Sequence, residues 1–469
     1  MSIENEKDMP EGEVASTGKM ISWVFGDIPG YYLEAAYAVF IFFFYEVEVG
    51  LSVLYVGLGL VIFAIWNMVN DPLVGYLTDK PFKWTAKWGM RFPWIMIGVF
   101  PTLIFYFLVY IPPDVDAATN PLPVFLYMVI MLCLFDLFYS LFSAHYYGSF
   151  ANHFRTDYER RKASFFDTII PGLGSFGLSL IPPLFIVYGV KSSYALAILI
   201  LVIIMAICAI ISIPGIRESE ELKEVFIQGY EKAEKLSYLK VMKIAFNKKN
   251  FNVLLVTYTL FMAGYLLIFA SGLYYFKDVL ELPYAYAVIS SIALYVGFLI
   301  SIPIWLVIAK RIGHAQTFTI GVFLSSVTLI PFLWVTTFDE YLIFQFIAGF
   351  GFGAFWFMFM AVMADVNDEV SLAIGKRQDS TLVGIRTFFY RTAFIIQAIV
   401  ITVVHLWTGY NPDPFAKQTP LAVWGVRVHA ALIPAIFNFI GFLIFLIWYD
   451  LKDEKKEQIF ALLREKGLK

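Results

Sequence analysis

Long apolar stretches separated by short polar ones run through the chain from residue 21 to residue 449. A helix needs about 20 apolar residues to cross the roughly 30 Å hydrocarbon core of a bilayer, and these stretches reach that length. They are too long for barrel strands of roughly 10 residues and do not alternate in polarity. The pattern predicts about twelve membrane-spanning helices, at residues 21–46, 51–78, 92–111, 121–150, 164–190, 193–213, 251–276, 284–309, 317–336, 341–365, 380–407 and 424–449.

The longest polar interruption, residues 214–249, divides these spans six and six. We therefore expect two six-helix halves, at 21–213 and 250–450, joined by a central cytoplasmic loop at 214–249. Polar tails at 1–20 and 451–469 complete the chain. The central loop has the pattern of a charged amphipathic helix, which is interpreted as a tether on the membrane surface or as a regulatory helix.

The composition agrees with a membrane protein and narrows the function. The chain is 60% hydrophobic and only 15% charged, whereas about a quarter of a soluble domain is charged. A nucleic-acid binder, a disordered chain and an ordinary soluble enzyme are thereby excluded. Two cysteines provide no disulfide framework and no metal-ligand spacing. We expect no cofactor and no tightly bound metal ion.

The basic residues are distributed unevenly between the two sides of the predicted spans. About 28 of the 34 lysines and arginines fall in the tails and in the loops on the same side as the tails, and four fall in the opposite loops. Cytoplasmic loops carry such an excess, so both termini are expected in the cytoplasm. The prediction is a multi-pass protein of the cell membrane, monomeric, whose partners are the lipid bilayer and a small-molecule substrate.

Four motifs occur in order along the two halves. Residues 66–75 read Trp-Asn-Met-Val-Asn-Asp-Pro-Leu-Val-Gly, with Asp79-Lys80 following, and residues 156–161 read Thr-Asp-Tyr-Glu-Arg-Arg. In the second half, Asn247–Phe251 precede Ala364-Asp365-Val366-Asn367-Asp368 and Gly375-Lys376-Arg377. These stretches resemble the glycoside–pentoside–hexuronide:cation symporter family, the melibiose-permease-like group of the major facilitator superfamily. The resemblance implies an all-α integral membrane fold whose two halves rock about a central site by alternating access.

The resemblance also implies cation-coupled symport, but several family residues differ here. Asp71 matches a cation-binding aspartate of the second helix, whereas Asn67 stands at the position of the other. Ser143 falls on the fourth-helix aspartate, with Ser140 at the neighbouring hydroxyl position, and Tyr31 falls on the acid that binds sugar hydroxyls. Arg391 falls on the eleventh-helix lysine. These departures leave H⁺ or Na⁺ open as the coupling ion.

Ionisable residues inside the spans are costly and are functional by default. At about 1.5 Å per residue, Asp71 and Arg386 lie roughly 10 Å from the cytoplasmic helix ends, and Asn67 and Arg391 roughly 16 Å. The matched depths predict an ion pair between the second and eleventh spans, either opening and closing during transport or static. The coupling candidates are Asp71, Asn67, Glu34, Ser140, Ser143 and Asp136. A proton needs a single carboxylate, so we expect proton coupling rather than sodium coupling.

Aromatic side chains at similar depth are candidates for contact with substrate, since they stack on sugar rings or amphipathic solutes. The predicted substrate residues are Tyr31, Glu34, Trp66, Tyr139, Tyr147, Trp356 and Arg391. Charged residues at the cytoplasmic helix ends are expected to control gating, or to be a solvated loop. These gating candidates are Asp79, Lys80, Asp365, Asp368, Arg377 and Arg386.

Three classes of function compete on these observations. A secondary transporter is favoured, with a glycoside-like substrate first and a lysolipid or organic anion as the alternative. A membrane-embedded enzyme would need a nucleophile and a base, for which Ser143 with His145 is the faint candidate. A non-transporting sensor with the same fold is the third class.

Overall fold

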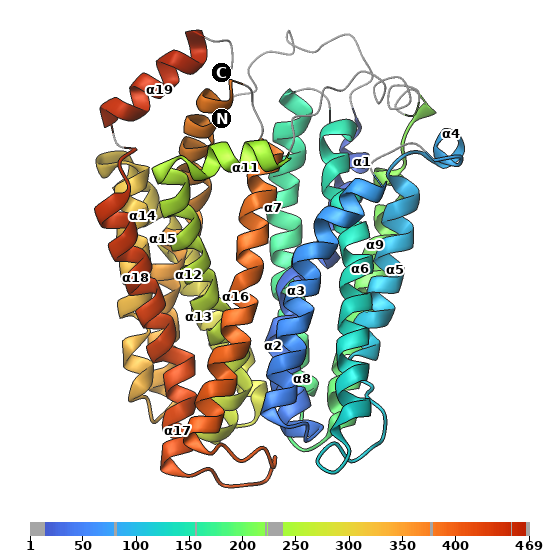
Figure 1. The fold of residues 1–469 in the computed structure, drawn as a ribbon, viewed down its shortest axis with the longest axis vertical. Coiled ribbons are helices and arrows are strands. Elements are labelled where there is room, and N and C mark those ends of the chain that lie inside the picture. The colour runs from blue at the N-terminus through green and yellow to red at the C-terminus, as the bar shows by residue number, and fades with distance from the viewer. Residues whose placement is uncertain are drawn as a thin grey trace.

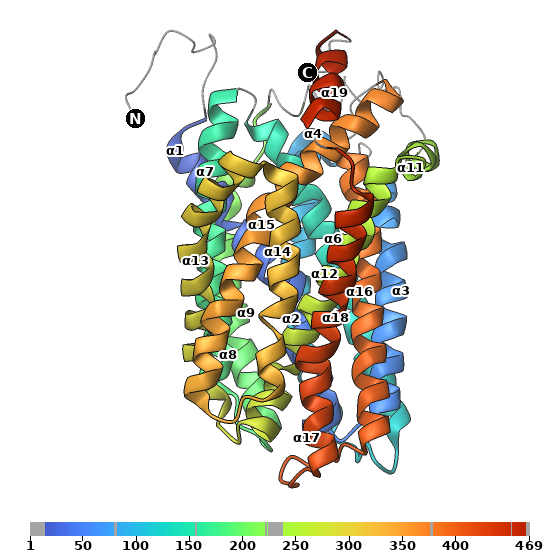
Figure 2. The same cartoon turned by 90° about the vertical axis from the view of Figure 1, so that its left-hand side faces the viewer.

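The computed structural model describes residues 15–78, 82–154, 157–220, 223, 238–375, 379–451 and 453–465. Within these residues every regular element is a helix or a helical turn, and the long helices stand side by side along a common axis (Figure 1). The all-α prediction is therefore confirmed. Helices α4, α11 and α19 lie at one end of the bundle, here called the near end, and α17 lies at the opposite far end (Figures 1 and 2).

The first set of helices extends from α1 to α9. Its elements are α1 (Thr17–Phe25), α2 (Asp27–Phe43), the π-helical turn η2 (Phe44–Glu48), α3 (Val53–Thr78), α4 (Thr85–Trp88), α5 (Phe92–Leu108), α6 (Pro121–His153), α7 (Asp157–Ser179), α8 (Ile181–Phe185) and α9 (Lys191–Ile216). The first predicted span is thus broken at Gly26, where a β-carbon would lie 2.6 Å from the ring of Tyr146. Glycine permits this close approach because it has no side chain.

The second set extends from α11 to α19. Its elements are α11 (Tyr238–Phe246), α12 (Lys249–Tyr274), η3 (Tyr275–Val279), η4 (Tyr284–Tyr286), α13 (Ala287–Ile312), α14 (His314–Val327), η5 (Ile330–Leu333), α15 (Phe338–Ile374), α16 (Asp379–Thr408), α17 (Pro420–Arg427), η6 (Val428–Leu432), α18 (Ile433–Trp448) and α19 (Asp453–Glu465). Turns η3 and η6 are π-helical, as η2 is. In the described part of the chain, ten helices are long and apolar enough to cross a membrane, and α5 is a shorter apolar helix.

The two sets meet along a small number of helix pairs. Helix α2 packs on α12, α3 packs on α16, and α8 contacts α13. The rings of Phe176 on α7 and Tyr295 on α13 lie with their centroids 4.0 Å apart. Most of these contacts are apolar, but two buried groups of polar side chains lie where α3 meets α16 and where η2 meets α12 and α16. The group between α3 and α16 is the candidate site, and the group around η2 is a second polar cluster.

Candidate ion and substrate site

A buried polar group at Asp136 connects α3 to α6. The Asp136 side chain is 1% exposed. The side-chain amide of Asn67 donates to its Oδ1 at 2.6 Å, and that of Asn70 donates to its Oδ2 at 3.0 Å. Asn67 and Asn70 are three positions apart and therefore lie on one face of α3. Two neutral amide groups thus bind one carboxylate inside the bundle.

Asp71 extends this group to the second set of helices. Its Oδ1 accepts a hydrogen bond from Ser140 Oγ at 2.5 Å, and its Oδ2 lies 3.3 Å from Arg391 Nη2 on α16. Asn70 also donates to Ser140 Oγ at 2.9 Å, so a chain of hydrogen bonds through Asn70 and Ser140 connects the two carboxylates. We call Asn67, Asn70, Asp71, Asp136, Ser140 and Arg391 the central cluster.

The pairing by matched depth was wrong in one respect, because Arg391 and not Arg386 contacts Asp71. An arginine side chain reaches about the length of a helical turn beyond its own Cα, so backbone depth does not define where the guanidinium lies. Arg386 instead stacks over the rings of Tyr258 and Phe359, at 5.2 and 5.1 Å from their centroids.

The contacts of the central cluster contain two carboxylates and one guanidinium. With both acids ionised, these groups carry one net negative charge. A buried charge without a counter-charge is strongly unfavourable, so such a cluster calls for a further cation, either a proton on a carboxylate or a metal ion. Oδ1 of Asn67 and Oδ1 of Asn70 are also buried without a hydrogen-bond partner.

Other coupling and gating candidates lie apart from the central cluster or outside the described residues. Ser143 is half-buried about one turn beyond Ser140, and the described contacts of the cluster do not include it. Asp79, Lys80 and Arg377 lie outside the described residues, as does the side chain of Glu34. His145, the faint catalytic candidate, is hydrogen-bonded to Thr78 Oγ1 at 2.7 Å and stacked on Trp94.

The structure separates the predicted substrate-binding aromatics into two groups. Tyr31, Trp66 and Tyr147 are 59%, 37% and 44% exposed. Tyr139 is buried and donates to the backbone oxygen of Gly30 at 3.1 Å, and Trp356 packs edge-on against Phe261 and Tyr265. The rings of Tyr31, Trp66 and Tyr147 are therefore partly exposed, whereas Tyr139 and Trp356 pack against neighbouring helices.

Arg386 lines a small hollow of about 20 Å³ between α12, α15 and α16, which is room for about one water molecule. Its neighbours there are mainly apolar, and they include the aromatic ring of Tyr258 and the side-chain amide of Asn367. Nε of Arg386 is buried without a hydrogen-bond partner. A guanidinium in such surroundings favours an anionic group, because apolar walls strengthen electrostatic attraction.

At the near end, the acids of α15 contact helix α19. Asp365 Oδ2 lies 2.6 Å from Lys456 Nζ, and Asp368 is buried close by on α15. Asp450, just beyond α18, is bound by Lys455 and by Asn250 at 2.5 and 2.8 Å. Although partial burial raises the pKa of Asp450, these donors hold it below its usual range. In the described part of the near end, the base that pairs with Asp365 therefore comes from the C-terminal helix.

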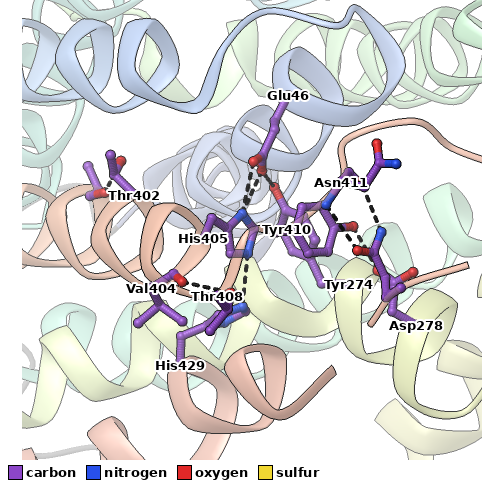
Figure 3. Close-up of polar contacts among 12 residues, drawn as sticks. Glu46, Tyr274, Asp278, Thr402, Val404, His405, Thr408, Tyr410, Asn411 and His429 are labelled. Atoms are coloured by element: carbon purple, nitrogen blue, oxygen red, sulfur yellow. Dashed lines mark hydrogen bonds and ion pairs between the residues drawn. The ribbon is translucent and has the colours of Figure 1, made fainter. Parts of the chain in front are cut away.

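A second buried cluster lies at the far end and was not predicted from the sequence (Figure 3). The carboxylate of Glu46 on η2 accepts a hydrogen bond from Tyr274 Oη at 2.5 Å and lies 2.9 Å from His405 Nδ1. His405 Nε2 is 3.2 Å from His429 Nε2, and His429 Nδ1 is 2.6 Å from Ser271 Oγ. We call these five residues the far-end cluster. It joins the first set of helices to the second, as Asp71 and Arg391 do.

Comparisons with known proteins agree with this architecture. The nucleoside transporter NupG superposes with a TM-score of 0.59 at 15% identity, over 93% of this chain and all of that one. The glucuronide carrier protein homolog of Escherichia coli is 24% identical over 94% of each chain. The sodium-dependent lysophosphatidylcholine symporter 1-A of Danio rerio is 22% identical over 85% of this chain and 80% of its own.

A sequence model of the family described as MFS/sugar transport protein matches residues 22–453, which is nearly the whole chain. The predicted major facilitator fold is therefore confirmed, and the relatives are transporters rather than enzymes. The resemblance read from the motifs in both halves is confirmed by the same matches. The chain belongs to the MFS/sugar transport family and is a secondary transporter of the major facilitator superfamily.

Proposed function

We propose that the protein is a proton-coupled symporter in which Asp136 takes up the coupling proton. The observation that carries this proposal is the uneven charge of the central cluster, where two carboxylates face one guanidinium. A proton on Asp136 makes the buried cluster neutral and leaves Asp71 paired with Arg391. Loss of that proton leaves one negative charge inside the bundle, which is unfavourable until the site is reloaded or exposed to water.

The same geometry links the proton to movement of the two halves, which are the first and second sets of helices. The Asp71–Arg391 contact crosses from the first half to the second. Asn70 donates to Asp136 and to Ser140, and Ser140 donates to Asp71. Because this chain of hydrogen bonds places Asp136 close to the ion pair, the charge on Asp136 alters the electrostatic field at Arg391. Protonation therefore changes the attraction between the halves, and an alternating-access transporter needs such a link. Asn67, Asn70 and Ser140 position the two acids.

Sodium is the second candidate for the coupling ion. The unpartnered buried Oδ1 atoms of Asn67 and Asn70 favour it, since a sodium ion needs several oxygen ligands. The relative from Danio rerio is a sodium-dependent symporter. Against sodium, both amides present N–H groups to Asp136, so their oxygens would have to turn around to contact an ion at that carboxylate.

For the substrate we propose a glycoside that carries an anionic group. The family description names sugar transport, and one relative is a glucuronide carrier homolog. Arg386, in the hollow beside Tyr258 and Asn367, offers a guanidinium that suits an anionic group, and the hollow would have to widen to admit the sugar ring. A lysolipid is the alternative, supported by the lysophosphatidylcholine symporters among the relatives.

Uptake into proteoliposomes tests the coupling ion and the substrate together. Radiolabelled glucuronide is expected to accumulate under an inwardly directed proton gradient, to leak out when a protonophore is added, and to be indifferent to replacement of sodium by choline. Asp71→Asn should abolish accumulation because it removes the partner of Arg391. Strict sodium dependence without a pH response would overturn proton coupling. Uptake of lysophosphatidylcholine but not of glucuronide would replace the proposed substrate.

The proposal includes an orientation, with both termini in the cytoplasm and the far end outside. It also includes two halves joined by the loop at 214–249, as the positions of the basic residues suggest. Cysteines placed at Asn120 and Asp413 should react with an impermeant reagent applied to intact cells, and one at Lys243 should react only after permeabilisation. The reverse pattern would invert the topology.

A further inference from the structure

The far-end cluster holds the two halves together through ionisable side chains. Glu46 is the member from the first half, and Tyr274, His405, His429 and Ser271 belong to the second half. Tyr188 Oη adds a contact between the halves nearby, donating to the backbone oxygen of Leu273 at 3.3 Å. In an alternating-access transporter the contacts that close one end must break when that end opens. Glu46 and His405 would then meet water from that side.

The hydrogen bonds of the cluster determine how many protons it holds. Ser271 has one hydroxyl hydrogen, which it donates to the backbone oxygen of Leu267 at 2.5 Å. When Ser271 makes that bond, the 2.6 Å contact with His429 Nδ1 uses a hydrogen on His429, and this is the arrangement in which the buried cluster is neutral. The 3.2 Å contact between the two Nε2 atoms needs another hydrogen, and the contact between His405 Nδ1 and Glu46 needs a third.

Three hydrogens on one carboxylate and two imidazoles give a net charge of zero, whichever partner carries each of them. A glutamate beside two neutral histidines would hold one hydrogen fewer and carry one negative charge. The closed far end thus contains one proton more than the same groups hold in neutral water, where histidine titrates near about pH 6.5. Glu46, His405 and His429 are each 2% exposed or less, so the neutral form is strongly favoured in the closed state.

One lysine and two acids adjoin the cluster, and Oε2 of Glu48 is buried without a hydrogen-bond partner. Lys277 Nζ lies 2.7 Å from Asp278 Oδ1, and Tyr410 Oη donates to Asp278 Oδ2 at 2.7 Å while its ring stacks on His405. Glu48 is buried on the same turn as Glu46 and accepts hydrogen bonds from the backbone N–H of Gly189 and from Tyr194 Oη. Lys277 also attracts Glu48, so these groups form a separate layer beside the cluster.

The local backbone provides an independent sign of function. Glu46 lies in π-helical turn η2, His429 lies in η6, and Lys277 with Asp278 lies in η3. π-helical turns are rare and occur often at functional sites, because the extra residue displaces a side chain from its regular helical position. Three such turns converge on one cluster here, and each contributes a buried ionisable residue to it or to the adjoining layer.

We propose that Glu46, His405 and His429 form a proton-binding site that controls closure of the extracellular gate. The gate closes with one proton bound from the outside and opens more readily when that proton is lost. This inference rests on the proposed function for the outward orientation of the far end. Unlike Asp136, this site takes up its proton from the extracellular side and returns it to the same side. It therefore responds to external pH and does not carry the coupling proton across the membrane.

The linkage has a defined sign. Above about pH 6.5, where the histidines of the open state are mainly neutral, the closed state binds up to one proton more than the open state, so lowering the external pH towards 6.5 favours closure. One linked proton changes the ratio of closed to open molecules by up to about tenfold per pH unit. At alkaline external pH the gate opens more often, and buried interface residues near Tyr274 become accessible from outside.

A reporter cysteine measures the opening without any substrate. Ala270 is fully buried on α12, one turn from Tyr274 and on the same helix face, and α12 packs on α2. Ala270→Cys, with Cys133 and Cys208 replaced by alanine, is treated with an impermeant methanethiosulfonate in cells at external pH 6.5 to 8.5. The rate at exposed Asp413→Cys corrects for the effect of pH on the reagent. The corrected rate at Ala270→Cys is expected to rise by at least tenfold from pH 6.5 to pH 8.5.

Two variants test the assignment to this site. Glu46→Gln removes the carboxylate whose charge the proton cancels, and His405→Gln removes the imidazole, so each should flatten the pH dependence. Tyr274→Phe keeps every titrating group of the site and should keep the slope. An unchanged slope in both Glu46→Gln and His405→Gln, with correctly folded protein by size-exclusion chromatography, would overturn the proposal. No pH dependence in the unmodified cluster would do the same.

The result can be separated from failure of the proposed function. Asp71→Asn should stop accumulation of solute while leaving the pH dependence of labelling at Ala270→Cys intact. If Asp71→Asn transports normally but labelling depends on external pH as expected, the coupling site is wrong and the gate site stands. If labelling occurs only from the cytoplasmic side, the orientation is wrong and the extracellular gate is rejected.

Discussion

The central cluster and the far-end cluster perform the same structural task with different charges. Each joins the two halves through an acid of the first half and a base of the second, Asp71 with Arg391 and Glu46 with His405. The central cluster contains a permanent cation and one carboxylate in excess. The far-end cluster contains no permanent cation, and its burial favours the neutral form with one added proton. An excess acid suits ion binding, whereas an acid–imidazole pair suits a response to pH.

The two clusters also differ in backbone. Asn67, Asn70 and Asp71 come from the regular helix α3, where positions three and four apart share a face. Glu46 and His429 come from the π-helical turns η2 and η6. Regular spacing made part of the first cluster predictable, and irregular spacing concealed the second. The following substitutions test whether the central cluster depends on a permanent charge and the far-end cluster on a proton.

Arg391→Ala should have the largest effect. It leaves the buried Asp136 and the partly exposed Asp71 without the guanidinium. Removing one partner of a fully buried pair costs about 3–5 kcal/mol, and the 31% exposure of Asp71 lowers that cost. The expected result is a large loss of thermal stability in detergent, measured by tryptophan fluorescence, together with loss of active transport. Combining it with Asp71→Asn should recover much of the stability. Wild-type stability of the single variant at neutral pH would show that the cluster was already neutral without the arginine.

Asp136→Asn should abolish accumulation but keep exchange. For one proton per solute, a gradient of one pH unit supports about tenfold accumulation. Without a titrating group at this position, we expect that ratio to fall to unity. Counterflow of labelled against unlabelled solute, which needs no net proton movement, should continue. Retained uphill transport would place the coupling proton on another residue.

Tyr274→Phe should loosen the far-end cluster moderately. The change removes the hydroxyl that donates to Glu46 and leaves one carboxylate oxygen with fewer partners. A net loss of about 1 kcal/mol corresponds to roughly fivefold more frequent opening. Labelling of Ala270→Cys from outside at a fixed pH measures this ratio. The variant should leave the sodium or proton dependence of transport unchanged, since Tyr274 does not contact the central cluster in the described structure.

Asn67→Asp should have the smallest effect, on ion preference alone. It restores a carboxylate beside Asp136, where Asn67 now donates at 2.6 Å. The added negative charge should favour a metal ion over a single proton, so that uptake becomes about threefold faster in sodium than in choline. Uptake rates in the two salts at constant pH provide the measurement. Equal rates would mean that the oxygens around Asp136 do not converge on an ion.

The pattern of apolar and polar residues was enough to predict the helical spans, and the motifs were enough to predict the family. Ten spans are recovered as long apolar helices in the described residues, and the major facilitator fold is confirmed. Hydrophobic length is a local property, because the bilayer thickness sets it helix by helix. Asp71, Asp136 and Arg391 were identifiable for a similar reason, since a charge within an apolar run stands out.

Only the tertiary structure decided which of these side chains meet. Asp71 and Arg391 are 320 positions apart, and Glu46 and His405 are 359 apart. Helix packing, which local periodicity does not specify, paired Asp71 with Arg391 rather than with Arg386. His405 lies inside a predicted span and could have been noticed as an ionisable group in the membrane. Its function depends on Glu46 and His429, which π-helical turns at two distant chain positions bring to the same point.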